Sequence, residues 1–82
     1  KNSLVANGCK LEGTTTDSIL FRGVKVGKHA RIKNSIIMQK SVIEEGAVVE
    51  YAILDKEVTV KRGQVIRGTA EEPIVIKKQT IV

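Results

Sequence analysis

The chain has 82 residues, a formal net charge of +5 at neutral pH, a single cysteine and almost no aromatic residues. One cysteine excludes an internal disulfide, and a chain this short forms at most one domain with a modest core. No stretch resembles a signal peptide or a membrane span, so a reducing, cytoplasmic setting is expected. A strand-like pattern is already present at Leu4, and the chain begins at Lys1 without methionine, so we expect a piece of a longer protein.

Aliphatic residues recur along the chain at intervals of about six residues. Val5 and Leu11 begin the series, and one longer interval of nine residues then leads to Leu20. From there the steps are six or five residues, and any three consecutive steps add up to 17. The positions are Leu20, Val26, Ile32, Ile37, Ile43, Val49, Leu54, Val60 and Ile66. Neither a helix nor a simple alternating strand has this period.

A six-residue interval fits one short strand and one tight corner, so three intervals close a triangular coil with aliphatic side chains inside. The sequence therefore predicts an all-β fold, a parallel β-helix of about four coils, in one domain over residues 1–82. The irregular first interval predicts a coil clipped at Gly13-Thr14. Regular coils are expected over residues 4–70. Pro73 cannot donate to a sheet ladder, which predicts a terminal edge or capping strand over residues 73–82.

The fourth residue of each six-residue block is expected to lie at a corner. Glycine occupies this position in four blocks, and it takes the positive φ angle of a sharp corner without steric cost. The eight corner positions are Gly8, Gly23, His29, Lys40, Gly46, Glu57, Gly63 and Gln79. The residue after the first corner, Cys9, is predicted to be a small core residue.

Stacking at a 17-residue period predicts columns of side chains on the outer faces. Two columns alternate in charge and should help to set the register; they are Lys28, Glu45 and Arg62, and then Lys33, Glu50 and Arg67. A third column, formed by Arg22, Gln39 and Lys56, contains no acid. Arg22 and Lys56 are therefore the candidates for binding phosphate or another anion.

Phe21 and Met38 stack just outside the core phase, and Asp55 follows in the same column. A solvent-facing pair would indicate a contact surface for a neighbouring subunit or another domain. The alternative is that a distortion of the coil turns both side chains inward. With so few aromatic residues to stack on bases, we do not expect nucleic-acid binding.

The hexapeptide pattern, with small residues such as Ala30, Ser41 and Ala47 at its fifth position, resembles the left-handed β-helix of hexapeptide-repeat proteins. The left hand is implied by this resemblance alone, since parallel crossovers are otherwise almost always right-handed. More narrowly, residues 2–5, 18–24, 33–39 and 53–56 resemble the C-terminal domain of bacterial glucose-1-phosphate adenylyltransferase, or ADP-glucose pyrophosphorylase. The tail over residues 68–76 is more similar to the regulatory, D-type subunit of the two-subunit enzymes.

The resemblance implies a C-terminal fragment of an enzyme of glycogen biosynthesis, a nucleotidyltransferase that makes ADP-glucose and pyrophosphate from ATP and glucose 1-phosphate. That family's nucleotide-binding motif lies in an N-terminal α/β domain, which this sequence lacks. We therefore expect no catalytic residue, metal site or cofactor here, with Mg²⁺ and ATP bound in the missing catalytic domain. For this domain the resemblance implies contact with the N-terminal domain, assembly of a homo- or heterotetramer, and allosteric regulation by a phosphorylated effector. No membrane partner is expected.

Two other functions remain open at this point. Hexapeptide acyltransferases share the β-helix, depend on acyl-CoA and use a histidine at a subunit interface as general base. His29 is the single histidine, but its corner position favours a structural role, because histidine tolerates left-handed backbone. The third possibility is a scaffold domain of another sugar nucleotidyltransferase.

Overall fold

A computed structural model describes residues 2–82, which form thirteen short strands and no helix. The strands, in chain order, are β1 (Leu4–Val5), β2 (Lys10–Leu11), β3 (Thr14–Thr16), β4 (Ile19–Leu20), β5 (Lys25–Val26), β6 (Arg31–Lys33), β7 (Ile36–Ile37), β8 (Val42–Ile43), β9 (Val48–Glu50), β10 (Ala52–Leu54), β11 (Thr59–Val60), β12 (Val65–Arg67) and β13 (Ile74–Ile76). Each strand is bounded by corners, as the six-residue interval predicts.

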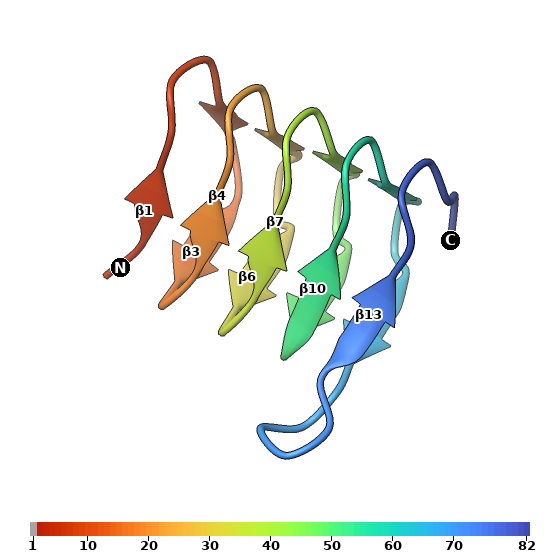
Figure 1. Ribbon diagram of the computed structural model, residues 1–82. Coiled ribbons are helices and arrows are strands. Elements are labelled where there is room, and N and C mark those ends of the chain that lie inside the picture. The colour runs from red at the N-terminus through yellow and green to blue at the C-terminus, as the bar shows by residue number, and fades with distance from the viewer. Residues whose placement is uncertain (1) are drawn as a thin grey trace.

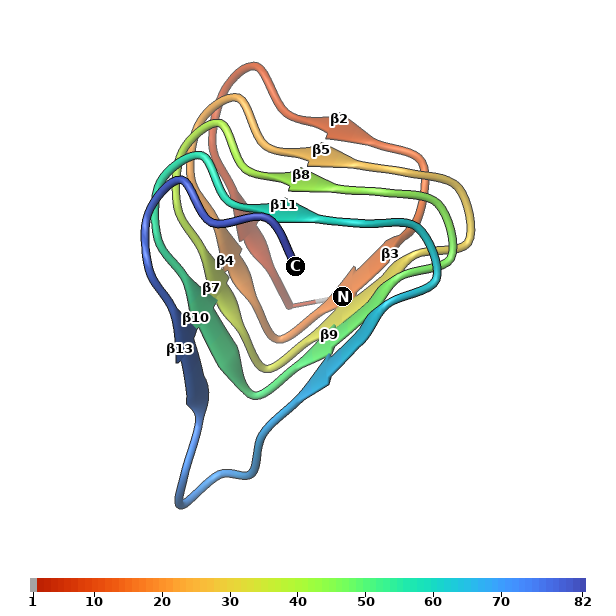
Figure 2. The same ribbon diagram turned by 90° about the vertical axis from the view of Figure 1, so that its right-hand side faces the viewer.

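The strands stack into three parallel sheets that form the sides of a triangular coil (Figure 1). Sheet A has the order β1-β4-β7-β10-β13, sheet B β11-β8-β5-β2 and sheet C β12-β9-β6-β3. In Figure 2 the chain runs clockwise around the triangle while it advances toward the viewer from the N-terminal to the C-terminal coil. The coil is therefore left-handed, and the predicted left-handed parallel β-helix is confirmed.

The first coil is shorter than those that follow. In the middle coils Ser18 and Ser35 are 17 residues apart and hydrogen-bonded, whereas Ser3 and Ser18 are hydrogen-bonded at a spacing of 15. The two missing residues fall between β2 and β3, at the corner that holds Gly13. A Cβ atom on Gly13 would lie 2.4 Å from the carbonyl oxygen of Ala30. The clipped coil at Gly13-Thr14 is thus confirmed, and its tight corner has room only for glycine.

The last coil is longer, because the loop between β12 and β13 contains extra residues. Ala52 pairs with Ile74, and the spacing between these coils is 22 residues instead of 17. The loop projects past one corner of the triangle (Figure 2). After β13 the chain makes one more isolated bridge, between Thr59 and Ile81, and the C-terminal residues turn inward over the last coil (Figure 2).

All eight predicted corner residues have a positive φ angle, including 78° at Gly8 and 63° at His29. The structure contains a second set of left-handed corners, at the entrance to sheet A. Its members are Asn2, Asp17, Asn34 and Tyr51. The sequence analysis missed this set, although Asn and Asp recur at one phase and both tolerate left-handed backbone through local hydrogen bonds.

Aliphatic side chains fill the inside of the triangle. The buried apolar residues are Leu20, Val24, Val26, Ala30, Ile32, Ile37, Ile43, Ala47, Val49, Ala52, Leu54, Val58 and Val60. Three buried serines join them, and their hydroxyls link successive coils: Ser35 Oγ donates to the Lys33 carbonyl at 2.9 Å and accepts the Ala52 amide at 3.1 Å. Cys9 packs against this core half-buried, as predicted.

The two predicted charge columns behave differently. Arg67 Nε lies 2.9 Å from Glu50 Oε1, which confirms a pair in the second column. This is the one ion pair recorded within residues 2–82, so the first column forms none. Its side chains are exposed at a corner, where solvated charges gain little from pairing. The amide of Arg62 instead donates to Glu44 Oε1 at 3.0 Å.

Candidate functional site

A hollow of about 230 Å³ lies along the corner between sheets A and B. The strands of sheet A all end at this corner, and every coil except the first contributes residues that follow its strand. The lining residues are Arg22, Gln39, Lys40, Lys56, Glu57, Lys78 and Gln79. They form two stacked columns, with Arg22, Gln39, Lys56 and Lys78 in one and Lys40, Glu57 and Gln79 in the other. Equivalent residues are 17 apart in the middle coils and 22 apart between the last two coils.

Backbone hydrogen bonds hold these columns in register. The amide of Lys40 donates to the carbonyl of Arg22 at 3.0 Å, and the amide of Gln79 donates to that of Lys56 at 2.9 Å. Between them, the amide of Glu57 donates to the carbonyl of Gln39 at 3.0 Å. The backbone under the hollow is thereby fixed, while the long side chains above it reach into solvent.

The hollow carries an excess of positive charge. Four of its lining residues are cationic and one, Glu57, is acidic. Glu57 Oε1 accepts a hydrogen bond of 3.1 Å from Gln79 Nε2, so its carboxylate is already engaged. Lys56 and Lys78 are neighbours in one column, where stacked coils lie about 4.8 Å apart, and Gln39 separates Lys56 from Arg22. Cations gathered along one corner repel each other. A bound anion would relieve this repulsion and accept hydrogen bonds from several donors.

Arg22 and Lys56, the two residues that the sequence analysis singled out, both line this hollow. The structure adds Lys40 and Lys78, which the sequence analysis missed as members of the site. Lys40 had been interpreted only as a corner residue. Lys78 falls in the column of Lys56 once the longer last coil is counted, which a strict 17-residue period conceals. Whether the hollow binds an anion stays a prediction.

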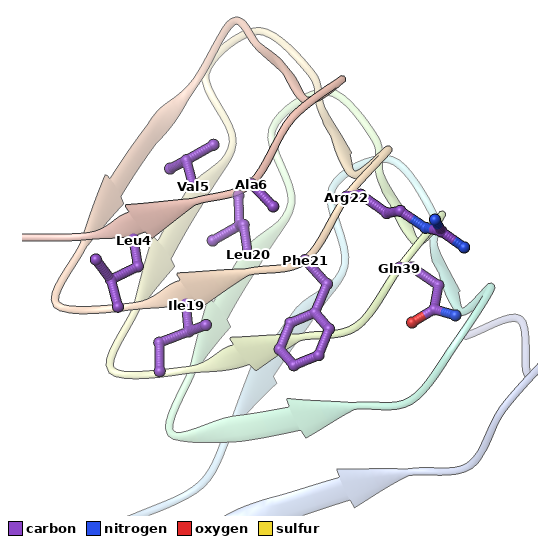
Figure 3. A pocket seen from close by; sticks show the side chains of 8 residues that line it. All are labelled: Leu4, Val5, Ala6, Ile19, Leu20, Phe21, Arg22 and Gln39. Atoms are coloured by element: carbon purple, nitrogen blue, oxygen red, sulfur yellow. The ribbon is translucent and has the colours of Figure 1, made fainter.

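Phe21 and Met38 lie on the outer face of sheet A. Phe21 is 39% exposed and Met38 is half-buried, so neither side chain turns into the core. Figure 3 shows Phe21 beside Ile19, along the first coils. Phe21 and Ile19 line an apolar hollow of about 600 Å³ together with Leu4 and Val5, and Met38 lies outside it. The solvent-facing alternative is therefore the one that the structure supports.

His29 lies exposed at a corner between sheets B and C, with the left-handed backbone expected of a corner residue. No side-chain hydrogen bond to its imidazole is recorded within residues 2–82, so nothing in the described chain orients the ring. A general base needs such a partner to present the correct nitrogen. The structural role is consistent with this geometry.

Side chains that could ligate a metal are dispersed. Within residues 2–82, no three His, Cys, Asp or Glu side chains come together in a group that could hold a metal ion. The same residues contain no helix long and apolar enough to cross a membrane.

Comparisons with known proteins agree with the fold. The family described as GlmU-like, C-terminal hexapeptide matches residues 1–76. The chain is 53% identical over 95% of its length to the glycogen biosynthesis protein GlgD of Bacillus subtilis (strain 168). It is 34% identical over 82% of its length to glucose-1-phosphate adenylyltransferases of Bacillus thuringiensis (strain Al Hakam) and Bacillus cereus (strain Q1). No solved structure matches significantly.

These matches confirm the resemblance predicted from the sequence. The chain spans only 23% of the length of the GlgD protein and 18% of the length of the adenylyltransferases. Because the family match extends over nearly the whole chain and the fold is a hexapeptide coil, the chain belongs to the GlmU-like C-terminal hexapeptide family.

Proposed function

We propose that this chain is the C-terminal assembly and regulatory domain of a longer protein that takes part in glycogen biosynthesis. The observation that carries the proposal is the 53% identity, over 95% of the chain, to a protein named for glycogen biosynthesis. The activity of the whole protein would be the formation of ADP-glucose and pyrophosphate from ATP and glucose 1-phosphate. A regulatory, D-type subunit fits the higher identity to GlgD than to the adenylyltransferases.

The β-helix would not itself catalyse this reaction. We assign Mg²⁺ and ATP to the N-terminal catalytic domain of the longer protein, because the adenylyltransferase family that the sequence resembles binds its nucleotide there. The cytoplasm is the compartment where such a protein would meet its substrates. Assembly would join this domain to its own catalytic domain and to further subunits, in a homo- or heterotetramer.

Regulation would act through the basic hollow. Arg22 and Lys56 come from coils at different heights, and Lys40 and Lys78 extend the same surface. A phosphate group offers several acceptor oxygens, so it can be bound by cations from more than one coil at once. A phosphorylated sugar is the class of effector that fits, because the neutral side chains of Gln39 and Gln79 offer hydrogen bonds to its hydroxyls.

The test uses the full-length protein, assayed alone and mixed with a catalytic-type partner subunit. ADP-glucose formation is measured while inorganic phosphate or glucose 6-phosphate is titrated as the probe. We expect the Arg22→Ala, Lys56→Ala protein to need a roughly tenfold or higher concentration of the effective probe, since about 1.4 kcal/mol of lost binding changes the affinity tenfold. Lys61→Ala is the matched control, because Lys61 is an exposed cation that follows β11 of sheet B.

Two results would contradict the proposal in different ways. If ADP-glucose forms but the Arg22→Ala, Lys56→Ala protein responds to the probes like the unmodified protein, the hollow is not the effector site. If no combination forms ADP-glucose and acyl transfer to a sugar or amine is detected instead, the assignment to glycogen biosynthesis is wrong. His29→Ala would then be the variant to examine for loss of acyl transfer.

A further inference from the structure

The outer face of sheet A is aliphatic along its whole height. Its first outward column runs through all five strands, and the register pairs its members directly: Leu4, Ile19, Ile36, Ile53 and Val75. Leu4 and Val75, at the two ends, are 69% and 63% exposed. Figure 1 shows these strands as one row, with no segment of the described chain in front of them. A sheet face of this kind is normally covered.

The other two faces lack this character. Sheet B presents lysines at Lys10 and Lys25, and sheet C presents Arg31 and Lys33 in one strand. The contrast is internal to the molecule, since all three sheets surround the same core. The second outward column of sheet A is also apolar in the first coils, where it contains Phe21 and Met38, and becomes charged at Asp55.

In two of the five coils, the two edges of this face carry opposite charges. In the second coil Asp17 precedes β4 and Arg22 follows it. In the last coil the loop before β13 contains Glu71 and Glu72, and Lys77 and Lys78 follow the strand. Each of these coils therefore begins its passage across sheet A with an acid and ends it with a base.

We propose that the outer face of sheet A is a self-complementary interface that binds the same face of a second copy of this chain. The two-fold axis runs parallel to the axis of the β-helix. Rotation about it makes the strands of the second copy antiparallel to those of the first and places each coil opposite the equivalent coil of the second copy. The acidic edge of one copy then faces the basic edge of the other, Asp17 against Arg22 of the second copy. The same operation packs Ile19 against Phe21 of the second copy, in a sheet-on-sheet contact about 10 Å thick.

The face is small, which determines how strong this contact is. Five strands spaced by about 4.8 Å, and about five residues across, give a surface of roughly 350 Å² per copy. Standard interfaces bury about 800 Å² per partner. The interface alone therefore supports a weak dimer that depends on protein concentration. This inference specifies the assembly role proposed above and rests on it.

Sedimentation velocity of the 82-residue chain over a concentration series tests the interface. The unmodified chain should shift from monomer toward dimer as its concentration rises. Phe21→Glu should weaken the dimer at least about tenfold, because it places a charge against Ile19 of the second copy. Val65→Glu is the matched control: Val65 is an exposed aliphatic residue on the outer face of sheet C, and its replacement should leave the dimer intact. Circular dichroism checks that each variant keeps the strand signal.

A charge exchange tests the two-fold arrangement independently. Asp17→Arg and Arg22→Asp should each weaken the dimer, because each places like charges opposite one another across the axis. The double variant should regain the affinity of the unmodified chain. A double variant weaker than both single ones overturns the arrangement, and a chain that stays monomeric throughout overturns the interface itself.

These experiments contain no nucleotide or phosphosugar, so their outcome is separate from that of the ADP-glucose assay. A monomeric chain combined with effector-dependent synthesis by the full-length protein would refute the interface and leave the proposed function standing. A dimer with the expected variants, combined with no ADP-glucose formation, would do the reverse.

Discussion

Replacing Gly13 with alanine is expected to loosen the first coil and leave the others in place. The new Cβ atom would lie 2.4 Å from the carbonyl oxygen of Ala30 and 2.7 Å from that of Gly27. Real Cβ atoms essentially never come closer than 3.0 Å, so the backbone of the first coil has to move by at least 0.6 Å (3.0 − 2.4). Both neighbouring atoms belong to the backbone, so no side-chain rotation can relieve the contact.

The cost should be local. Overpacking of this kind costs about 1–3 kcal/mol, and β1, β2 and β3 are each the edge strand of their sheet, so they can shift without breaking a second ladder. The amide of Thr14 donates to the same Ala30 carbonyl at 3.0 Å. Its hydrogen exchange should therefore accelerate by about tenfold to a hundredfold. The amide of Val42, which donates to Val58 in the middle coils at 2.9 Å, should keep its protection.

Amide exchange followed by nuclear magnetic resonance measures both effects in one experiment. Gly46→Ala is the control, because Gly46 has open space around its Cβ position and a φ angle of 74°. Its cost of about 1–2 kcal/mol arises from left-handed backbone and falls on the middle coils. If Thr14 keeps full protection in Gly13→Ala, or if Val42 loses protection equally, the steric argument for the clipped corner is refuted.

Three further substitutions probe the core and the charge column. Ile37→Ala should lower the free energy of unfolding by about 2–5 kcal/mol, because Ile37 is fully buried. Urea unfolding measures this free energy, and a loss under about 1 kcal/mol would contradict the packing. Ser41→Ala should lower the free energy of unfolding by about 1–3 kcal/mol, because Ser41 Oγ donates to the Asp55 carbonyl and accepts a hydrogen bond from the Val58 amide. An unchanged urea midpoint would disprove the contribution of these two hydrogen bonds. Arg67→Ala should cost under about 1 kcal/mol, and the difference from the unmodified chain should vanish in thermal melts at 1 M salt.

The sequence determined the coil because its signal is periodic and local. One inward aliphatic residue per side, and a residue that tolerates positive φ at each corner, specify a triangular turn with no need to know what lies beyond the next coil. The corner at His29 could be predicted for this reason, although a lone histidine also permits a catalytic interpretation. The clip at Gly13 could be predicted as well, because the nine-residue interval from Leu11 to Leu20 departs from the regular spacing.

Tertiary structure decided which columns meet and which faces stay open. Lys78 joins Arg22 and Lys56 only because the loop before β13 shifts the last coil by five residues (22 − 17), and sequence spacing does not reveal how an inserted loop is absorbed. Likewise, the sequence marks Phe21 and Met38 as apolar, but whether they point inward depends on the exact turn of each corner. Periodicity specifies the repeating unit, whereas the irregular insertions between units determine the surface that the stack presents.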